Sequence, residues 1–372
     1  MLKSSSELNP RTTSYEFLGP PGALLITLAL ALIPARVSAA LSDPAWWNGL
    51  WDTQAALLYL AWYAFCLVAW AVLPGDRVLG TTLRTGEKKQ YKINAFSTFL
   101  LTLGLTCGSI YRYGPQSFTF INEKFVGFIT ASVIMSVVQG VAFFIGRELN
   151  PMSIGSFDLK TFNELRPGLI LWTLIDISMV CEQATRRGGL GQVTDSLWAR
   201  PALPWIVCSD ALYNEPGIFT QMDITTDGFG FMLAVGDLAW VPFVYCLQAR
   251  YLVFNPIELG PIWATTIVLF NMAGYYIFRT ANAEKNDFRN GKNPKNLEFF
   301  TTESGHPNYF GDLLMALAWS FPTAFSTPVT YFYVIYFTGL LMHRQRRDDE
   351  NCEKKLEEIH EDVPYRIIPY VY

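Results

Sequence analysis

Long apolar stretches separated by short polar segments dominate the sequence, and most of them match the length of a membrane-spanning helix. Such a helix needs about 20 mostly apolar residues to cross the hydrocarbon core of a bilayer. The last long stretch, 311–342, is broken by two prolines, so we divide it into two spans. The stretch 199–213 is short and also holds two prolines, so we treat it as a doubtful, degenerate span. The remaining predicted spans are 21–41, 54–74, 94–112, 124–146, 167–185, 229–254 and 257–279.

The composition agrees with this pattern. The 372 residues are 51% hydrophobic and 15% aromatic, and only 16% are charged, whereas soluble domains contain about 25% charged residues. The net charge of -4 gives no basic excess of the kind that binds nucleic acid. We therefore predict an all-α, polytopic membrane protein with about ten transmembrane helices, one of them degenerate.

Basic residues indicate which side of the membrane each loop faces, because cytoplasmic loops are rich in lysine and arginine. The loops 77–93 and 280–310 and the tail after residue 342 are basic, whereas the loop 42–53 carries aspartates and no base. An even number of spans places all three basic segments and the N-terminus in the cytoplasm. The predicted parts are a cytoplasmic N-terminal segment at 1–20, a transmembrane domain at 21–343 and a cytoplasmic C-terminal part at 344–372.

The first apolar stretch has a second interpretation. Its sequence GALLITLALALIPARVSAAL has the apolar core and the small residues before a cleavage site that are typical of a secretory signal. The cytoplasmic location of 77–93 requires this span, so we predict that it is retained.

Carboxylates within or beside the apolar stretches are candidates for a functional site, because burying an ionisable group in a membrane is costly. A structural role is an equal alternative for each of them, since a carboxylate can also bond a neighbouring helix or cap a helix start. The candidates are Asp176 and Asp237 inside predicted spans, Asp210 and Glu215 beside the doubtful span, and Asp227 just before a span.

Histidine and cysteine do not indicate a metal site or disulfides. The three histidines are widely spaced, and none of the six cysteines forms a CxxC pair. Five of the cysteines lie in or beside apolar stretches, so we predict that they are buried thiols. We expect no metal centre.

Polar clusters recur where the chain leaves the membrane on its predicted cytoplasmic side. Lys285 and Arg289 are four residues apart and would share one face of a helix, where they could bind phosphate groups. The alternative is ordinary positive charge beside a span. Asn308 and Tyr309 can donate and accept hydrogen bonds, although this segment could instead be a helix start that is capped by Asn308 or by the polar residues before it. A third polar band, 340–355, follows the last span, and its alternative is a stop-transfer patch.

Several segments resemble motifs of the sterol reductase family. The resemblance begins at YEFLGPPGA, residues 15–23, and continues in order to residue 372 through GRELNP, GSFDLKTFNELRPGL, DALYNEP, MDITTDGFGFMLAVGDLAWVPFVY, HPNYFGD, LLMHRQRRDDENCEKK and VPYRIIPYVY. This family includes the delta(14)- and delta(24(28))-sterol reductases, the 7-dehydrocholesterol reductases and the membrane domain of the lamin B receptor. The segments GPPGALLITLALAL and DLKTFNELRPGLILWTLIDIS are most similar to the fungal delta(14) branch.

The resemblance implies a multi-pass protein of the endoplasmic reticulum membrane that takes a sterol from the bilayer. It implies reduction of the C14=C15 double bond with NADPH in ergosterol or other sterol biosynthesis, by protonation at C15 and hydride transfer to C14. Carboxylates and aromatic faces would stabilise the intermediate cation, and a dry pocket would protect it from water. No nucleic acid partner is expected, and the resemblance names no protein partner.

The resemblance also implies which residues hold the cofactor. Asp348 is in addition expected to deliver the proton, which makes it the candidate catalytic residue. The carboxylates near the spans remain the candidates for the sterol pocket: Asp210, Glu215, Asp227 and Asp237. The residues carried over for NADPH are Lys285, Arg289, Asn308, Tyr309, Asp348, Cys352, Glu353, Lys354, Lys355 and Leu356.

The chain departs from the family pattern at several places. A tryptophan-bearing segment is absent, because Gly305 is followed directly by His306. Leu356 stands where the family has a tyrosine, and LEEIHED follows it in place of an aromatic-rich segment. Val207 replaces an aromatic residue, and Met152 replaces an arginine. These departures are typical of deleted or re-read segments.

Three other functions therefore stand beside an active delta(14)-sterol reductase. The chain could be a catalytically impaired paralogue, or a truncated gene product, that binds sterol without turnover. It could be a sister sterol reductase that acts on another double bond. A transporter with carboxylates at the membrane midplane is less favoured, because the sequence shows no internal repeat.

Overall fold

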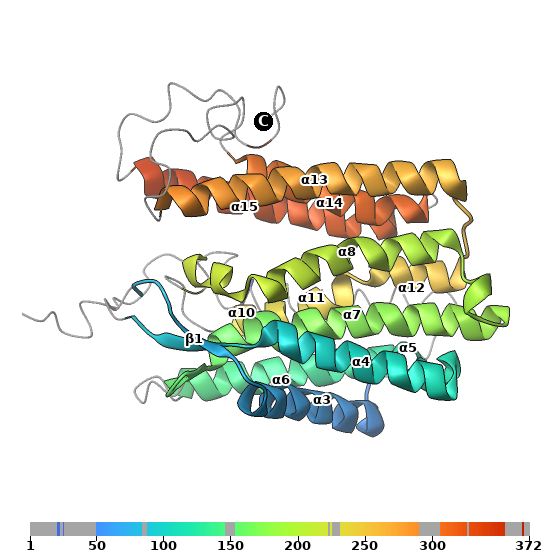
Figure 1. The fold of residues 1–372 in the computed structure, drawn as a ribbon, viewed down its shortest axis with the longest axis horizontal. Coiled ribbons are helices and arrows are strands. Elements are labelled where there is room, and N and C mark those ends of the chain that lie inside the picture. The colour runs from blue at the N-terminus through green and yellow to red at the C-terminus, as the bar shows by residue number, and fades with distance from the viewer. Residues whose placement is uncertain are drawn as a thin grey trace, which may run out of the picture. The chain divides into compact units, whose positions relative to one another are not determined.

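The chain is mostly helical and divides into two compact units (Figure 1). Unit 1 comprises Met1–Val193 and Cys208–Val253, and unit 2 comprises Thr194–Val207 and Phe254–Tyr372. The computed structural model describes residues 21–22, 25, 50–83, 88–145, 153–221, 224, 231–289, 306–325, 327–353 and 367, with the backbone alone at 143–145, 153–154, 286, 288–289 and 347–353.

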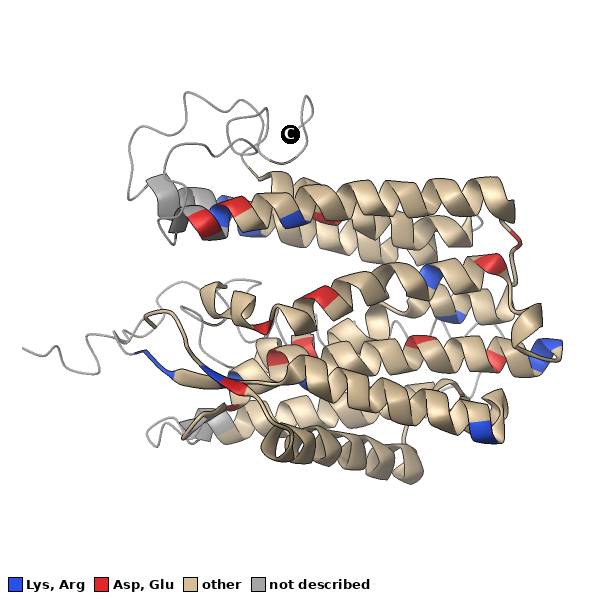
Figure 2. Ribbon diagram, viewed as in Figure 1, with Lys and Arg blue, Asp and Glu red and all other residues tan. Residues whose placement is uncertain are grey.

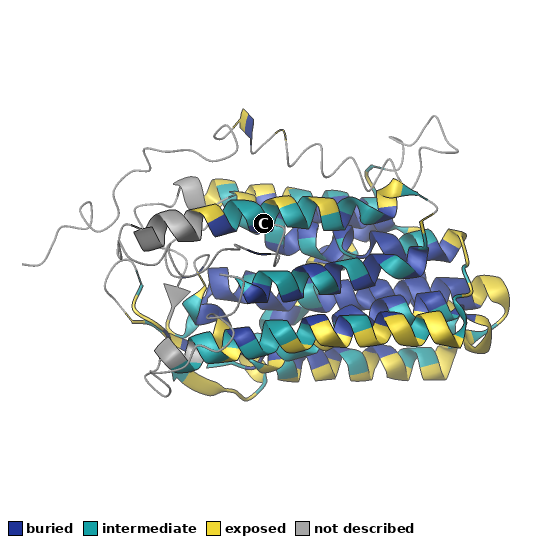
Figure 3. Cartoon of the chain, turned by 90° about the horizontal axis from the view of Figure 1, so that it is seen from above, coloured by how far each residue is buried: buried dark blue, intermediate teal, exposed yellow. Residues whose placement is uncertain are grey.

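Unit 1 is organised around one long, buried helix, α7 (Leu159–Arg187). Almost every residue of α7 from Lys160 to Ala184 is buried, whereas α3 exposes several large apolar side chains. Figure 3 shows that some helices of the chain are almost entirely buried and that others have an exposed face. The other helices of unit 1 are α3 (Thr53–Val72), α4 (Ala95–Tyr113), α5 (Phe120–Glu123), α6 (Phe125–Ile145), α10 (Phe231–Val235), α11 (Val241–Val244) and α12 (Leu247–Phe254). Shorter turns are η2 (Pro115–Phe118), η3 (Leu190–Gln192), η4 (Glu215–Thr220) and the π-helical turn η5 (Gly236–Trp240).

Two short antiparallel hairpins join these helices. In the first, β1 (Asp76–Leu79) pairs with β2 (Gln90–Ile93), so that Asp76 lies opposite Ile93. In the second, β3 (Ser153–Ile154) pairs with β4 (Phe157–Asp158). The second hairpin leads directly into α7, which places the start of that helix beside β2.

Aspartate side chains fix the starts of two of the long helices. Asp52 Oδ1 accepts a hydrogen bond from the Ala55 nitrogen at 2.9 Å, and its Oδ2 accepts one from Lys124 Nζ at 2.8 Å. Asp158 accepts in the same way from the Thr161 nitrogen at 3.2 Å. Each carboxylate thereby satisfies a backbone N–H that the helix itself leaves without a partner. The bond to Lys124 also ties the start of α3 to the segment before α6.

Unit 2 contains α13 (Gly260–Arg289), α14 (Pro307–Ser320) and α15 (Phe332–Glu353). Helices α13 and α14 are antiparallel and touch through their backbones, because a Cβ atom on Gly311 would lie 2.7 Å from the Phe278 nitrogen. Farther along, Trp319 Nε1 donates a hydrogen bond to Asn271 Oδ1 at 3.0 Å. The remaining elements are the turns η6 (Phe321–Thr323) and η7 (Pro328–Tyr331) and the first part of α8 (Asp195–Tyr213).

The helices follow the predicted spans closely. Within the described ranges, four are long and apolar enough to cross a membrane, namely Thr53–Val72, Phe125–Ala142, Phe231–Phe254 and Gly260–Lys285. The predicted division of 311–342 is confirmed, because α14 and α15 are separated by two turns that each contain a proline. Most of the first predicted span, 21–41, lies outside the described residues, and the count of about ten spans stays a prediction.

Two predictions need correction. Helix α8 is continuous through Pro201 and Pro204, so the stretch that we expected to be broken forms a full helix. Prolines are tolerated in such helices where neighbouring groups take up the backbone hydrogen bonds that they remove. Cys107 is exposed, contrary to the prediction of a buried thiol, whereas Cys66, Cys181, Cys208 and Cys246 are buried thiols, as predicted.

Candidate active site

Three helices of unit 2 carry those predicted cofactor residues that the structure describes, and they carry them at one end of that unit (Figure 1). Helix α14 is antiparallel to α15 as well as to α13, because Trp319 stacks on Tyr333 at 5.7 Å and Leu313 shares a buried cluster with Leu341. The C-terminal ends of α13 and α15 therefore lie at the N-terminal end of α14. Charged residues of these helices gather toward that end (Figure 2).

The rise per residue of an α-helix shows that the candidate residues of α13, α14 and α15 lie at similar heights along the helix axes. Lys285 is seven residues beyond Phe278, which is about 10 Å along α13 at 1.5 Å per residue. The backbone of Asp348 lies about as far beyond Leu341 on α15. Both positions are therefore level with, or just beyond, the first turn of α14, where Asn308 and Tyr309 lie.

Among the described residues, no side chain caps the first turn of α14. His306 occupies the cap position with φ -134° and makes no side-chain cap hydrogen bond, and Pro307 follows it. The backbone nitrogens of Tyr309 and Phe310 donate to the His306 carbonyl. Asn308 lies inside the helix, so the alternative interpretation of Asn308 as the cap is wrong. An uncapped helix start carries a partial positive charge that favours an anion.

Asn308 presents a buried acceptor at this turn. Its side chain is 9% exposed, and its Oδ1 atom has no hydrogen-bond partner among the described residues. Leaving a buried polar atom without a partner costs about 1–3 kcal/mol, so such an atom commonly marks a ligand or a water site. A bound donor group would satisfy it.

Tyr309 is held in a defined orientation from two sides. Its ring stacks on His306 with centroids 5.0 Å apart and planes at 14°. It also packs against a buried cluster that contains Leu313, Leu341 and Ile367. Ile367 is distant in sequence from the other two, so its side chain helps to position a predicted cofactor residue.

Several other predicted residues can be placed only by their backbone or not at all. Arg289 is the last residue of α13, and Asp348, Cys352 and Glu353 lie in the last turns of α15, where only the backbone is described. Lys354, Lys355 and Leu356, and the pocket candidate Asp227, lie outside the described residues. Their roles stay predictions.

Glu215 is engaged by the fold of unit 1. Its Oε1 accepts a short hydrogen bond from Arg166 Nη2, and its Oε2 accepts from the Ala95 nitrogen at 2.8 Å. Arg166 and Glu215 are both almost fully buried, and Arg166 also donates to Asn94 Oδ1 at 3.0 Å. This network joins α7, η4 and the start of α4. Arg166 was not among the residues predicted from the sequence, although an arginine beside an apolar span is itself a signal of a functional or structural site.

Asp237 lies at an irregular turn in unit 1. It belongs to the π-helical turn η5 and is 8% exposed. A Cβ atom on Gly168 of α7 would lie 1.9 Å from the Asp237 carbonyl oxygen, so only glycine permits this contact. Such π-helical turns are frequent at functional sites. Asp176 is likewise buried in unit 1, on α7. Asp210, in contrast, is half-buried and accepts from Asn214 Nδ2 at 2.7 Å.

Comparison with known proteins places the whole chain. It matches the Ergosterol biosynthesis ERG4/ERG24 family over residues 28–142 and 139–372. It is similar to "Delta(14)-sterol reductase erg24" of Schizosaccharomyces pombe, with 41% identity over 96% of this chain and 97% of the relative. It is similar to "Delta(14)-sterol reductase ERG24" of Candida albicans, with 38% identity over 99% and 100%, and to "Delta(14)-sterol reductase TM7SF2" of Mus musculus, with 40% identity over 96% and 97%.

The same comparisons show that this chain lacks internal residues that its relatives have. The alignment with the Schizosaccharomyces pombe protein spans 416 positions, and 96% of 372 residues is about 357, so about 59 positions have no residue in this chain. This number agrees with the expectation of missing segments, and the predicted positions of these segments, before His306 and after Leu356, stay predictions. The family match also comes in two pieces that meet at 139–142, inside α6, a place that the sequence analysis did not select.

The extent of the similarity and the apolar helices lead to the same conclusion about the family of this chain. The family match covers nearly the whole chain, and the curated relatives are covered almost completely. The apolar helices of the structure are those of a membrane protein. The chain therefore belongs to the Ergosterol biosynthesis ERG4/ERG24 family.

Proposed function

We propose that this chain is a delta(14)-sterol reductase that reduces the C14=C15 double bond of a sterol intermediate with NADPH in ergosterol or another sterol biosynthesis. The observation that supports the proposal most strongly is the similarity to proteins of that name at 37–41% identity over at least 96% of this chain. We further propose that it crosses the endoplasmic reticulum membrane about ten times and takes the sterol from the bilayer.

The residues at the end of unit 2 fit a nicotinamide cofactor. The unpartnered Oδ1 of Asn308 suits the amide donor of a nicotinamide, and Tyr309 offers a ring face that is held in place. Lys285 is half-buried at the same end, and together with Arg289 it would bind the phosphates. The uncapped start of α14 favours the same anionic groups. When bound, NADPH supplies a hydride, which this chain's side chains cannot provide.

The protein supplies the proton for the reaction and the side chains that surround the cofactor. We assign the proton that reaches C15 to the Asp348 carboxyl group, because its backbone lies level with the first turn of α14. Addition of a proton at C15 and a hydride at C14 saturates the double bond. Cys352, Glu353, Lys354, Lys355 and Leu356 remain the proposed continuation of the cofactor site.

The sterol pocket is proposed separately, from the carboxylates of unit 1. Glu215 is fully engaged with Arg166 and the start of α4, so we give it a structural role there. Asp237 is the stronger candidate, since it is buried at an irregular turn. Asp210 and Asp227 stay candidates without further support.

The test is product analysis with several sterols. Membranes that contain the chain are incubated with NADPH and, in parallel, with a delta(14), a delta(7) and a delta(24(28)) sterol, and products are identified by mass. The proposal predicts saturation of the delta(14) sterol alone. Saturation of another double bond instead would identify a sister reductase.

The internal shortness of the chain supports a second candidate, a sterol-binding protein without turnover. About 59 aligned positions of a curated relative are missing, and a tryptophan and a tyrosine of the family's cofactor site have no counterpart. NADPH titration of the purified chain separates the two. Micromolar binding supports the enzyme, whereas sterol binding without any NADPH binding at millimolar concentration supports the second candidate.

A further inference from the structure

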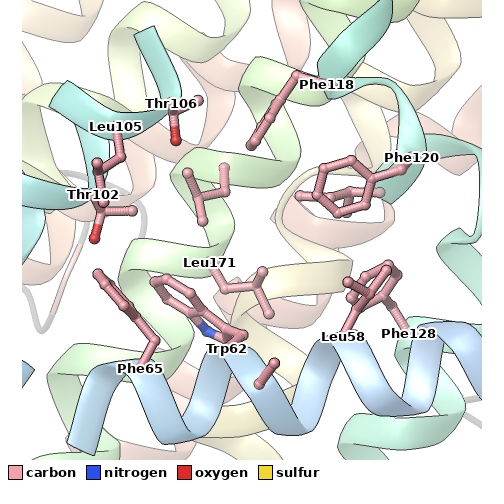
Figure 4. Close-up of a pocket in the computed structure, with 13 residues that line it drawn as sticks. Leu58, Trp62, Phe65, Thr102, Leu105, Thr106, Phe118, Phe120, Phe128 and Leu171 are labelled. Atoms are coloured by element: carbon pink, nitrogen blue, oxygen red, sulfur yellow. The ribbon is translucent and has the colours of Figure 1, made fainter. Parts of the chain in front are cut away.

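Unit 1 contains an apolar cavity of about 280 Å³ between α3, α4, α5 and α7 (Figure 4). None of the residues that line it is a candidate for the cofactor or for the sterol pocket described above. Its volume is near the lower limit of ligand pockets, which is about 300 Å³. The cavity is therefore a separate feature that the proposed reaction does not use.

Flat aromatic faces form much of its wall. Trp62 stacks on Phe65 with centroids 5.7 Å apart, and across the cavity Phe118 meets Phe120 edge-on at 5.3 Å (Figure 4). The polar atom of Trp62 is already satisfied, since its Nε1 donates to the Pro167 carbonyl at 3.2 Å. A ligand therefore needs no polar group to pack against Trp62, and the aromatic wall suits a flat hydrocarbon ring system.

One hydroxyl group in the cavity is different. Thr98 and Thr102 on the same face of α4 each donate to the carbonyl four residues before, at 3.1 and 2.8 Å. Thr106, the next residue in this series, is 6% exposed, and its hydroxyl makes no hydrogen bond within the part of the chain that the structure describes. In Figure 4 its oxygen points into the cavity. It offers a single hydrogen-bonding group in an otherwise apolar space.

The cavity is open on the outer side of α3 and α4. Ala61 and Leu105 line it, and Leu105 is 59% exposed. Leu171 and Leu174 of α7 form its buried floor. Helix α3 is one of the helices that can cross a membrane. The opening therefore faces bilayer lipid, and a ligand would enter from the membrane.

We propose that this cavity is a second sterol-binding site, in which the ring system of a membrane sterol lies between the aromatic faces and its hydroxyl group bonds Thr106. A sterol combines a flat apolar ring system with one hydroxyl, which is the combination that the cavity offers. A phospholipid acyl chain has no group for Thr106 to bond. The inference does not depend on the reductase activity, because it uses no residue of the candidate active site.

The test is photolabelling of the full chain in nanodiscs with a sterol that carries a diazirine in its rings. We expect labelled peptides from α3 or α4 and protection by added ergosterol. Loss of the Thr106 hydroxyl in Thr106→Val should raise the ergosterol concentration needed for half protection by about three- to tenfold, the range of one hydrogen bond. Thr106→Ser keeps the hydroxyl and should restore the wild-type value.

Thr102→Val is the matched control, since the Thr102 hydroxyl also lies at the cavity but is bonded to the Thr98 carbonyl. Ergosterol should protect this variant as it protects the wild type. The proposal is overturned if Thr106→Val and Thr102→Val behave alike, or if the label appears only outside α3 and α4, for example within residues 26–49. It is also overturned if a diazirine on a phospholipid acyl chain labels the same peptides and ergosterol does not displace it.

Discussion

The contact between α13 and α14 gives the sharpest test of the geometry around the candidate cofactor site. Gly311 lies where the two backbones touch, and a Cβ atom there would lie 2.6 Å from the Gly274 oxygen and 2.7 Å from the Phe278 nitrogen. Both neighbours are backbone atoms of a helix and cannot rotate away. Gly311→Ala therefore requires the helices themselves to separate.

The size of the effect follows from these distances. Ordinary contact begins at 3.4 Å, so the helices must move apart by about 0.8 Å. Such overpacking costs about 1–3 kcal/mol, and contact with fixed backbone favours the upper end. Alanine recovers about 1 kcal/mol of helix propensity relative to glycine. We expect Gly311→Ala to lose about 2 kcal/mol of stability, since the packing cost exceeds the propensity gain.

The assay compares this variant with a matched glycine substitution. A Cβ atom on Gly339 of α15 would meet no neighbouring atom within 4 Å, so Gly339→Ala should gain about 1 kcal/mol. Unfolding of the purified chains in mixed micelles measures the difference, and NADPH titration should show weaker binding only for Gly311→Ala, because the first turn of α14 shifts. Equal stability of the two variants would refute the close packing of α13 on α14.

Further predictions concern three polar positions. Asn308→Leu should weaken NADPH binding by about fivefold, since a hydrogen bond contributes about 1 kcal/mol, without lowering the thermal stability of the cofactor-free chain; a stability loss without a binding loss would assign Asn308 to the fold. Arg166→Met should destabilise the chain by about 3–5 kcal/mol, because it leaves the Glu215 charge buried and unpaired, and adding Glu215→Gln should restore much of that loss in the same unfolding assay. The hydrogen bond from Lys124 holds the pKa of Asp52 below its usual value of 3.8, so its stabilisation is present above about pH 4 and fades as the pH falls through the lower, folded-state pKa. Unfolding of the wild type and Asp52→Asn across pH 2–7 measures this, and a pH-independent difference would contradict it.

The apolar helices could be predicted from the sequence because bilayer thickness sets their length and composition. The predicted span 54–74 corresponds to α3 at Thr53–Val72, and the predicted span 94–112 corresponds to α4 at Ala95–Tyr113. Helix α7 shows the limit of this reasoning, since it begins at Leu159 and not at residue 167. Its first turns are polar but buried, because Asn163 and Arg166 find partners in distant segments.

The candidate site was predictable in its residue types but not in its geometry. The four-residue spacing of Lys285 and Arg289 anticipated that both would lie on one helix, and both belong to α13. The unpartnered Oδ1 of Asn308 and the contact of Ile367 with the Tyr309 cluster arise from packing between separate helices. No local pattern contains such contacts, and the π-helical turn at Asp237 was missed for the same reason.

The most direct measurement follows the two hydrogen atoms that the reaction adds. Membranes containing the chain are given a delta(14) sterol and NADPH carrying deuterium at the transferable position of the nicotinamide. The account predicts a saturated product with one deuterium at C14, and, with unlabelled NADPH in heavy water, deuterium at C15 instead. A sterol recovered with its C14=C15 double bond intact, or a product without deuterium from the cofactor, would contradict it.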